Sequence, residues 1–461
     1  MSTAHPGRPL EADALERVAA GAVARATHAG AEHAEACVES MRAFTARVNG
    51  GTIETLKQSV THGLGLRVLV GGAQGFVSTT DFAPDALDDL ARHAVALAGF
   101  STSDEANAFP TAVEAADGPP ADLDLVDPAI LALPAERKIE MALTLERAAL
   151  GSDPRIHRTD GAMVSTRDGQ GVIVNSGGLA REAAGTSISV SVVPLADDRD
   201  GRQQAGWYGM VKCRLDELED LEAIAREAAG RALARIGARQ VPTAHVPVIL
   251  SPDIAASWIG DLFEAFSGEA HLKKTSWLTG RLGEEIASGL VTLVDDGRLR
   301  RAVGSEPFDG EGFPTRRSVL IERGRFVTIL YDHYHARRAG TRSTGSAVRG
   351  YSSTPAIGSH NLFIEPGAAD PGEILRRVDR GFYMDDQGSY GFNPVTGDYS
   401  YQAQGFWVER GEKRFPVEGV TVASNSLEML RNVAAVGNDL KFLGSIASPT
   451  LLIQEMTVSG E

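Results

Sequence analysis

The hydrophobic pattern of the first hundred residues changes from helical to strand-like and back. Residues 11–30 are rich in alanine and repeat apolar side chains at the spacing of an amphipathic helix. The period then falls to two, and Asn49-Gly50-Gly51 separates two alternating runs. Asn-Gly at this point predicts a tight hairpin, because both residues adopt positive φ readily. A glycine-rich turn at 71–75 predicts another hairpin, and helical spacing returns at 85–98.

The chain continues with a similar mixture up to about residue 240. Residues 101–133 are rich in proline, alanine and aspartate and are expected to form a surface connection. Helices are predicted at about 134–150 and 221–233, where apolar residues recur every three or four positions. Between them, separate strands are expected from the runs AMVST, GVIVNS and TSISVSVVP, the second of which follows Asp168-Gly169.

A strongly apolar helix is predicted just after residue 250. Ser251 is expected to be its N-cap, with Pro252 in the first turn. Its buried stripe should consist of Trp258, Ile259, Leu262, Phe263 and Phe266.

Short strands and hairpins dominate the remaining prediction. Two Glu-Arg-Gly turns, at 322–325 and 409–412, each join two strand-like runs and predict hairpins. Longer helices after residue 267 are expected only near 371–380 and 425–435.

These elements predict an α+β protein of two parts. The stretch 236–247 is expected to separate them. The N-terminal domain, residues 1–240, would contain the helices and hairpins described first. The C-terminal domain, residues 241–461, would be built on a strongly curved antiparallel sheet.

Composition narrows the functional classes. The formal net charge is −16, which argues against nucleic-acid binding because that needs a basic face. The two cysteines, Cys37 and Cys213, have neither metal-ligand nor disulfide spacing. No run approaches the roughly 18 apolar residues of a membrane span, and the first residues lack a signal-peptide pattern. We therefore expect a cytoplasmic protein that binds neither nucleic acid nor membrane.

Two histidines are candidate metal ligands. His333 and His335 lie two positions apart on an expected strand end, so both side chains could face one side. Asp332 or His360 could complete a set of three ligands. The pattern favours the alternative, in which these are ordinary loop or surface histidines.

The segment from Arg337 to Gly350 is the densest basic stretch and a candidate binding loop. Its backbone N–H groups and arginines could hold a peptide main chain or carboxylate, and a flexible surface loop explains the same composition equally well. The residues singled out in it are Arg338, Arg342, Ser343, Thr344, Gly345 and Arg349.

Other short motifs favour structural roles. Asn393, Pro394, Gly397 and Asp398 have the chemistry of a turn, although Asn393 and Asp398 are kept as possible peptide-binding residues. Gly437-Asn438-Asp439 is interpreted as a helix C-cap and turn. The run GLGLRV at 63–68 lacks the third glycine of a dinucleotide fingerprint and opens a strand.

Several segments, in order along the chain, resemble the TldD/PmbA family. They are SVTHGLGLRVLVGGAQGFVSTTD at 59–81, SGEAHLKKTSWLTGRLGEEIASGLVTLVDD at 267–296, LYDHYHARRAGTRSTGSAVRG at 330–350, and the short motifs Asn393-Pro394, Thr396-Gly397-Asp398, Gly405-Phe406-Trp407 and Val436-Gly437-Asn438-Asp439. The resemblance extends from about Glu32 to Gly460. It implies a subunit of a paired cytosolic metallopeptidase.

The chain departs from the family's zinc-bearing subunit, which carries HExxxH on the first helix of its second domain. The expected His-Glu-His positions fall on or near Ile259, Gly260 and Glu264, and no cysteine follows Cys213. The sequence is therefore similar to the PmbA (TldE) type, which the resemblance pairs with a TldD-like HExxxH zinc subunit.

The resemblance thus implies a non-catalytic, zinc-free subunit of a peptidase that cleaves unfolded or modified peptides. No catalytic residue and no cofactor are expected in this chain, and zinc is expected in the partner. Two alternatives stay open: an independent metallohydrolase using His333, His335 and His360, and a stand-alone peptide-binding homodimer.

Overall fold

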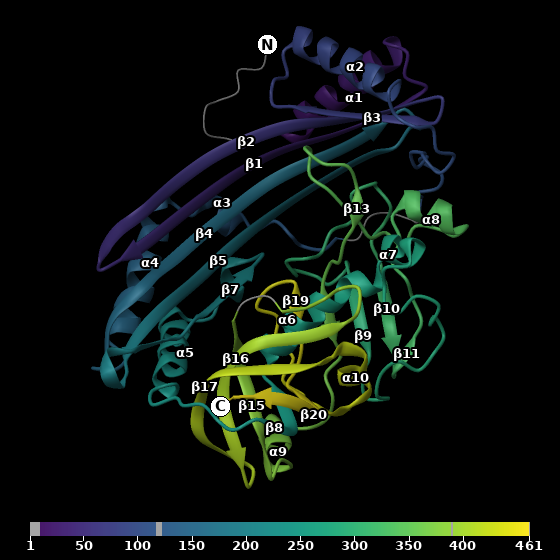
Figure 1. Ribbon diagram of the computed structural model, residues 1–461. Helices are drawn as coiled ribbons and strands as arrows, with labels where there is room; N and C mark the ends of the chain where they lie inside the picture. Colours follow the sequence, from purple (N-terminus) through teal and green to yellow (C-terminus); the bar gives the residue numbers. More distant parts are fainter. Residues whose placement is uncertain (1–9, 117–121, 389–390, 461) are drawn as a thin grey trace.

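The computed structural model describes residues 10–116, 122–388 and 391–460, and Figure 1 shows the arrangement of its elements. The small remaining parts of the two predicted domains and of the predicted connection lie outside the described residues. The helices are α1 Ala12–His28, α2 Pro84–Ala98, α3 Pro128–Ala132, α4 Ala135–Leu150, α5 Leu221–Ala234, α6 Pro252–Leu262, α7 Gly268–Lys273, α8 His333–Ala339, α9 Pro371–Arg376 and α10 Ser426–Arg431.

The strands fall into two groups along the chain. Those of the first half are β1 His33–Asn49, β2 Thr52–Val70, β3 Ala73–Thr79, β4 Ile156–Asn175, β5 Ala180–Asp197, β6 Gln203–Ala205 and β7 Tyr208–Lys212. Those of the second half are β8 Ala244–Leu250, β9 Leu293–Asp296, β10 Arg317–Glu322, β11 Arg325–Phe326, β12 Ala347–Val348, β13 Ala356–Ile357, β14 Leu362–Ile364, β15 Arg380–Gln387, β16 Asp398–Glu409, β17 Glu412–Asn425, β18 Val433–Val436, β19 Ile446–Ala447 and β20 Leu451–Ser459.

The first half is one long curved sheet, in the order β3-β2-β1-β4-β5-β6, with β7 also paired to β5. The predicted hairpin between β1 and β2 is confirmed. Gly50 and Gly51 have φ of 61° and 73°, the left-handed values that a two-residue hairpin turn requires. The second predicted hairpin joins β2 to β3 through Gly71 and Gly72, which also have positive φ.

The prediction of separate strands around Asp168-Gly169 is wrong. Strand β4 runs unbroken for 20 residues, because β1 pairs with it on one side and β5 on the other throughout this region. Asp168 does not turn the chain; its carboxylate pairs with Arg42 of β1 at 2.8 Å. Continuous pairing on both edges thus overrides the local turn preference of Asp-Gly.

The two faces of this sheet have different coverings. Helices α1 and α2 pack on the face that carries Ala34, Ala36 and Val38 of β1. Helices α4 and α5 pack on the same face further along, against Val164 and Val190 among others. The opposite face, with the odd-numbered residues of β1, β4 and β5, turns toward the second half (Figure 1).

The connection predicted at 101–133 is packed more closely than a surface segment. It contains α3, and Phe109, Ala115 and Ile130 are buried. The backbone carbonyl of Leu125 accepts a hydrogen bond from the N–H of Thr186 on β5 at 2.9 Å. This part of the chain therefore covers the free edge of β5.

The second half is built on a strongly curved sheet, as predicted. Strands β17, β16, β15, β8 and β20 are paired in that order, and β17 also pairs with β20, so the sheet closes on itself. Its pairs are antiparallel except that of β8 with β15, which is parallel. A separate sheet has the order β11-β10-β9-β14-β19, and in it β14 and β19 are parallel. The predicted Glu-Arg-Gly hairpins are present between β10 and β11 and between β16 and β17. The α+β class is confirmed.

Helix α6 fills the centre of this half. Of the predicted stripe, Trp258, Ile259, Leu262 and Phe266 are buried, while Phe263 is only partly buried. The indole N–H of Trp258 donates to the hydroxyl of Ser426 at 3.1 Å. Helix α5 ends at Ala234 and β8 begins ten residues later, so the proposed division near residue 240 lies between the two halves.

The helices predicted near 371–380 and 425–435 are shorter than expected. Helices α9 and α10 have six residues each, because β15 begins at Arg380 and β18 at Val433. Helix α8 was not predicted. Across the ranges described above, no helix is long and apolar enough to cross a membrane.

Candidate functional site

The two halves meet on the uncovered face of the first sheet. Glu35, Cys37 and Glu39 succeed one another on this face of β1, and the register places them beside Arg67, Gly65 and Gly63 of β2. Side chains alternate along a strand, so these six positions form one continuous patch.

Two glycines of β2 make room for a loop of the second half. A Cβ added at Gly63 would clash with the ring of Tyr351, and one added at Gly65 would clash with its backbone carbonyl oxygen. The run GLGLRV thus brings a strand and a loop into close contact. This explains its glycines without a nucleotide.

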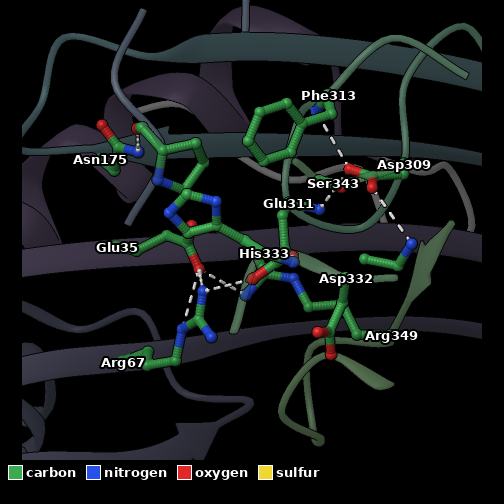
Figure 2. A network of polar contacts seen from close by, with 12 residues as sticks. Glu35, Arg67, Asn175, Asp309, Glu311, Phe313, Asp332, His333, Ser343 and Arg349 are labelled. Atoms are coloured by element: carbon green, nitrogen blue, oxygen red, sulfur yellow. Dashed lines mark hydrogen bonds and ion pairs between the residues drawn. The ribbon is translucent and has the colours of Figure 1, made fainter. Parts of the chain in front are cut away.

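A buried ion-pair network joins the halves beside this contact (Figure 2). Nη1 of Arg349 lies 2.6 Å from Oε1 of Glu35, and Nη2 of Arg67 lies 3.0 Å from the same oxygen. Burial disfavours the charged form of Glu35, but the two arginines outweigh it and lower its pKa. Nε and Nη2 of Arg349 have no hydrogen-bond partner among the described residues.

Two further carboxylates, Asp309 and Glu311, flank the network in Figure 2. Asp309 accepts hydrogen bonds from the backbone N–H groups of Glu311, Phe313 and Ala347 at 2.9, 3.0 and 3.1 Å. Burial is the main cause that raises the pKa of Asp309 to about 6 and that of Glu311 to about 8. Arg67 lies 3.4 Å from Glu311 and lowers its pKa, but by less than burial raises it.

A cavity of about 500 Å³ opens next to Arg349, between the sheet and the segment 303–310. Its floor consists of alternate residues of β4 and β5. Gly171 pairs with Ala183, Gly169 with Gly185, and Arg167 with Ser187. Four of these six residues are glycine or alanine, so the floor offers exposed backbone and little side-chain bulk.

Charged side chains lie around this floor. Glu39 pairs in register with Gly171 at one end, and Glu306 lines the cavity from the second half. Burial raises the pKa of both carboxyls. The thiol of Cys37 also lines the cavity, and burial raises its pKa to about 11, which makes it a poor nucleophile.

The predicted binding loop divides into exposed and buried parts. Arg338 is exposed and pairs with Asp104 at 3.3 Å, and Arg342 is exposed as well. Ser343 is buried, and its hydroxyl accepts the N–H of Gly345 at 3.1 Å. The hydroxyl of Thr344 donates to the carbonyl of Tyr331 at 3.0 Å.

Of the loop residues, Arg349 is the one that lines the cavity beside the sheet. The interpretation of the whole segment as a flexible surface loop is therefore wrong. Its first residues belong to α8, and the part from Ser343 to Ala347 is largely buried.

Asn393 and Asp398 form a turn, as predicted, and they do not line this cavity. Oδ1 of Asn393 accepts the N–H of Val395 at 3.0 Å, and Oδ2 of Asp398 accepts the hydroxyl of Thr396 at 2.7 Å. The prediction of a helix C-cap at Gly437 is wrong, because β18 precedes it and Asp439 binds the backbone N–H of Thr450.

The three candidate histidines have separate partners. His333 and His335 lie on helix α8, not on a strand end, because the carboxylate of Asp332 caps that helix by accepting the N–H of His335 at 2.8 Å. His333 packs against Phe313, and His360 bonds to Asp295 at 3.3 Å. Among the residues that the structure describes, no group of three or more His, Cys, Asp or Glu side chains is arranged to hold a metal ion.

Comparison with known proteins finds similarity to one family along most of the chain. Models of the PmbA/TldA metallopeptidase match as domain 1 at residues 34–98, as the central domain at 128–236 and as the C-terminal domain at 243–460. The metalloprotease PmbA of Escherichia coli O157:H7 is 30% identical over 429 residues, which cover 93% of this chain and 92% of the relative. The chain belongs to the PmbA/TldD metallopeptidase family.

Further members of this family agree in sequence and in fold. The PmbA homologue of Haemophilus influenzae is 30% identical over 448 residues, covering 97% of this chain and 96% of that protein. The crystal structure of TldE from Thermococcus kodakarensis matches with a TM-score of 0.84 at 23% identity, covering 95% of this chain and 99% of the other. That likeness shows a shared fold.

The family's zinc chemistry can be tested against the side chains on α6. Of the positions expected to hold His, Glu and His, Ile259 is a fully buried hydrocarbon and Gly260 has no side chain. Only Glu264 carries a donor group, and it lies just beyond the helix. A catalytic zinc needs three protein ligands. These residues do not fit the ion, so no chemical step is assigned to a metal in this chain.

Sequence reasoning missed the residues that define the site in this member of the family. Glu35, Arg67, Glu39 and Glu306 were not singled out. Glu35 and Glu39, four positions apart and therefore on one face of a mostly apolar strand, were a usable signal, because they mark a strand face that meets something polar. Their partners could not be found this way, since Arg349 lies 314 positions from Glu35.

Proposed function

We propose that this chain is the zinc-free subunit of a heteromeric metalloprotease that cleaves unfolded or modified peptides. In this assembly an HExxxH subunit supplies the zinc and its catalytic glutamate. The present chain forms part of the substrate cavity and contributes no metal ligand.

The observation that carries the proposal is the chemistry of α6. Ile259 packs in the core with no exposed surface, and Gly260 approaches the side chain of Ile446. Ordinary packing therefore occupies the positions where zinc ligands are expected from the resemblance. The resemblance also implies that the zinc-bearing subunit supplies a cysteine ligand near its C-terminus. In this chain the two cysteines, Cys37 and Cys213, both lie in the first half.

The cavity beside Arg349 supports the peptide-holding part of the proposal. Its floor of Gly169, Gly171, Ala183 and Gly185 lets a ligand approach the sheet closely. Unfolded peptides vary in side chain but share a main chain, and a small-residue floor tolerates that variation. The buried loop from Ser343 to Arg349 would serve mainly to fix the wall of this cavity.

Reconstitution with an HExxxH family member tests the proposal. The two chains should co-purify, and an unfolded peptide should be cleaved only when both are present. Substituting the HExxxH glutamate of the partner should abolish cleavage. Glu264→Gln in this chain should leave cleavage unchanged, because Glu264 is not a metal ligand in this account.

Two outcomes would overturn the proposal. One is metal-dependent cleavage by this chain alone. The other is failure to bind any HExxxH subunit from the same source, for example because the chain forms a stable homodimer instead.

A further inference from the structure

The cavity beside the sheet has carboxylates without cationic partners at one end. Among the described residues, no cation lies within ion-pair distance of Glu39 or Glu306. Glu39 accepts a hydrogen bond from the backbone N–H of Tyr351, and the charge of Arg349 acts on it from a greater distance, as that of His360 acts on Glu306. Burial raises the pKa of Glu306; the charge of His360 opposes this shift, and the charges of Asp309 and Glu39 add to it. Two mutually repelling carboxylates facing open space favour a positively charged ligand.

The other end of the same floor carries the opposite charge. Arg167 lines the cavity, is exposed, and has no hydrogen bond or ion pair within the described part of the chain. It lies four positions from Gly171, the register partner of Glu39. At about 3.3 Å per residue along a strand, the two ends are roughly 13 Å apart.

A second and independent feature points to a ligand at the acidic end. The side chain of Arg349 is 3% exposed and lines this cavity, and its Nε and Nη2 have no acceptor among the described residues. Buried donors are almost always paired, since an unpaired one loses its bonds to water. The carbonyl oxygen of a bound main chain would supply the missing acceptor.

We propose that this cavity binds short peptides by both free ends, with the terminal ammonium between Glu39 and Glu306 and the terminal carboxylate at Arg167. The proposal deepens the proposed function, on which it rests, by naming the substrate or product class as peptides of about four residues. An extended chain of that length spans the roughly 13 Å between the charged ends. Longer peptides would reach the cavity with one end only.

Calorimetric titration of the purified full-length chain with tetra-alanine tests this directly. Tetra-alanine has both free ends and small side chains that suit the floor. N-acetylation and C-terminal amidation, each applied alone, should weaken binding at least tenfold, because each removes one charge and leaves the main chain intact.

Variants assign each end to its residues. In the double variant Glu39→Gln and Glu306→Gln, acetylated and free peptides should bind equally, while amidation should still weaken binding. In Arg167→Gln, amidated and free peptides should bind equally, while acetylation should still weaken binding. Glu140→Gln and Arg147→Gln, at exposed positions of α4 on the other face of the sheet, are charge-matched controls that should leave binding unchanged.

A space-filling variant tests the location independently of charge. A Cβ added at Gly185 meets no atom within 4 Å, so Gly185→Val should fold normally and fill the floor. We expect it to abolish tetra-alanine binding with no loss of thermal stability.

The proposal is overturned if capped peptides bind as well as free ones, if free tetra-alanine does not bind, or if the charge variants leave the effect of capping unchanged. None of these results bears on the proposed function, which is measured by association with an HExxxH subunit. Conversely, the chain could bind peptides by both ends and yet fail to associate with any HExxxH subunit. That result would support this inference and contradict the proposed function.

Discussion

Two glutamates on the same face of β1, Glu35 and Glu39, have different surroundings. Glu35 is completely buried, and Arg349 and Arg67 surround it; this group is called the closed end. Four residues further along the same strand, Glu39 borders the cavity that Arg167 also lines, and no cation lies within ion-pair distance of it among the described residues; this cavity is called the open end. The strand pattern and the residue type are the same, so the difference comes from the neighbours. Glu35 lies beside Arg67 of β2 and Arg349 of the second half, whereas the β2 partner of Glu39 is Gly63. The ion pair between Glu35 and Arg349 joins the two halves, whereas Glu39 faces the cavity in which we propose that a ligand binds.

Removing a charge from the closed end should reduce the free energy of unfolding more than any other substitution considered below. Arg349→Met leaves Glu35 buried with one arginine in place of two. Breaking a buried ion pair typically costs about 3–5 kcal/mol, and urea unfolding should show a loss in this range. Arg167→Met, at the open end, should change stability by no more than about 0.5 kcal/mol. Equal losses in the two variants would contradict the distinction between the ends.

Glycine substitutions give a second contrast between the ends. Gly65→Ala would push its methyl group against the backbone of Tyr351. Overpacking of this kind costs about 1–3 kcal/mol, measurable by thermal unfolding. Gly185→Ala, where nothing lies within 4 Å, should be neutral or slightly stabilising. If Gly65→Ala is equally harmless, the loop of Tyr351 is not held against the sheet.

The hairpins show what could be predicted from sequence. The turns at Asn49-Gly50-Gly51 and at both Glu-Arg-Gly sequences depend on residues that are adjacent in the chain, and their φ angles are local properties. The uninterrupted β4 could not be predicted in this way, because pairing with β1 and β5 overrides the preference of Asp168-Gly169.

The site itself was largely invisible to sequence reasoning. Gly63 and Gly65 are explained only by Tyr351, and Glu35 only by Arg349, each contact joining distant parts of the chain. His333 and His335 were misplaced on a strand because the cap from Asp332 was not recognised. Arg349 was the one loop residue named in advance that lines the cavity.

The closed end should also respond to pH. Burial, reinforced by Asp309 and Asp332 and opposed by Arg67, raises the pKa of Glu311 from its ordinary value of 4.5 to about 8. The folded protein then holds a proton that the unfolded chain has released, so stability falls as pH rises through this window. The slope attributable to one such group is at most about 1.4 kcal/mol per pH unit.

Glu311→Gln isolates this contribution. Between pH 6.5 and 8.5, above the pKa of about 6 for Asp309, the variant should lose less stability than the wild type does. Denaturant unfolding at several pH values measures the slopes. Parallel curves for the two proteins would mean that Glu311 does not hold a proton in the folded state.

The smallest expected effect concerns the cap of α8. Asp332→Ala removes the acceptor for the N–H of His335, which should cost about 1 kcal/mol. Asp332→Asn keeps a side-chain oxygen and should retain most of that stability. Thermal unfolding of both variants makes the comparison, and similar losses would argue against the cap.

The most direct test of the account is the zinc content of the chain, purified alone without a histidine tag and again with an HExxxH subunit. The account predicts almost no zinc in the chain alone and about one zinc per pair in the active assembly. About one zinc per chain in the isolated protein, together with peptide cleavage, would contradict it.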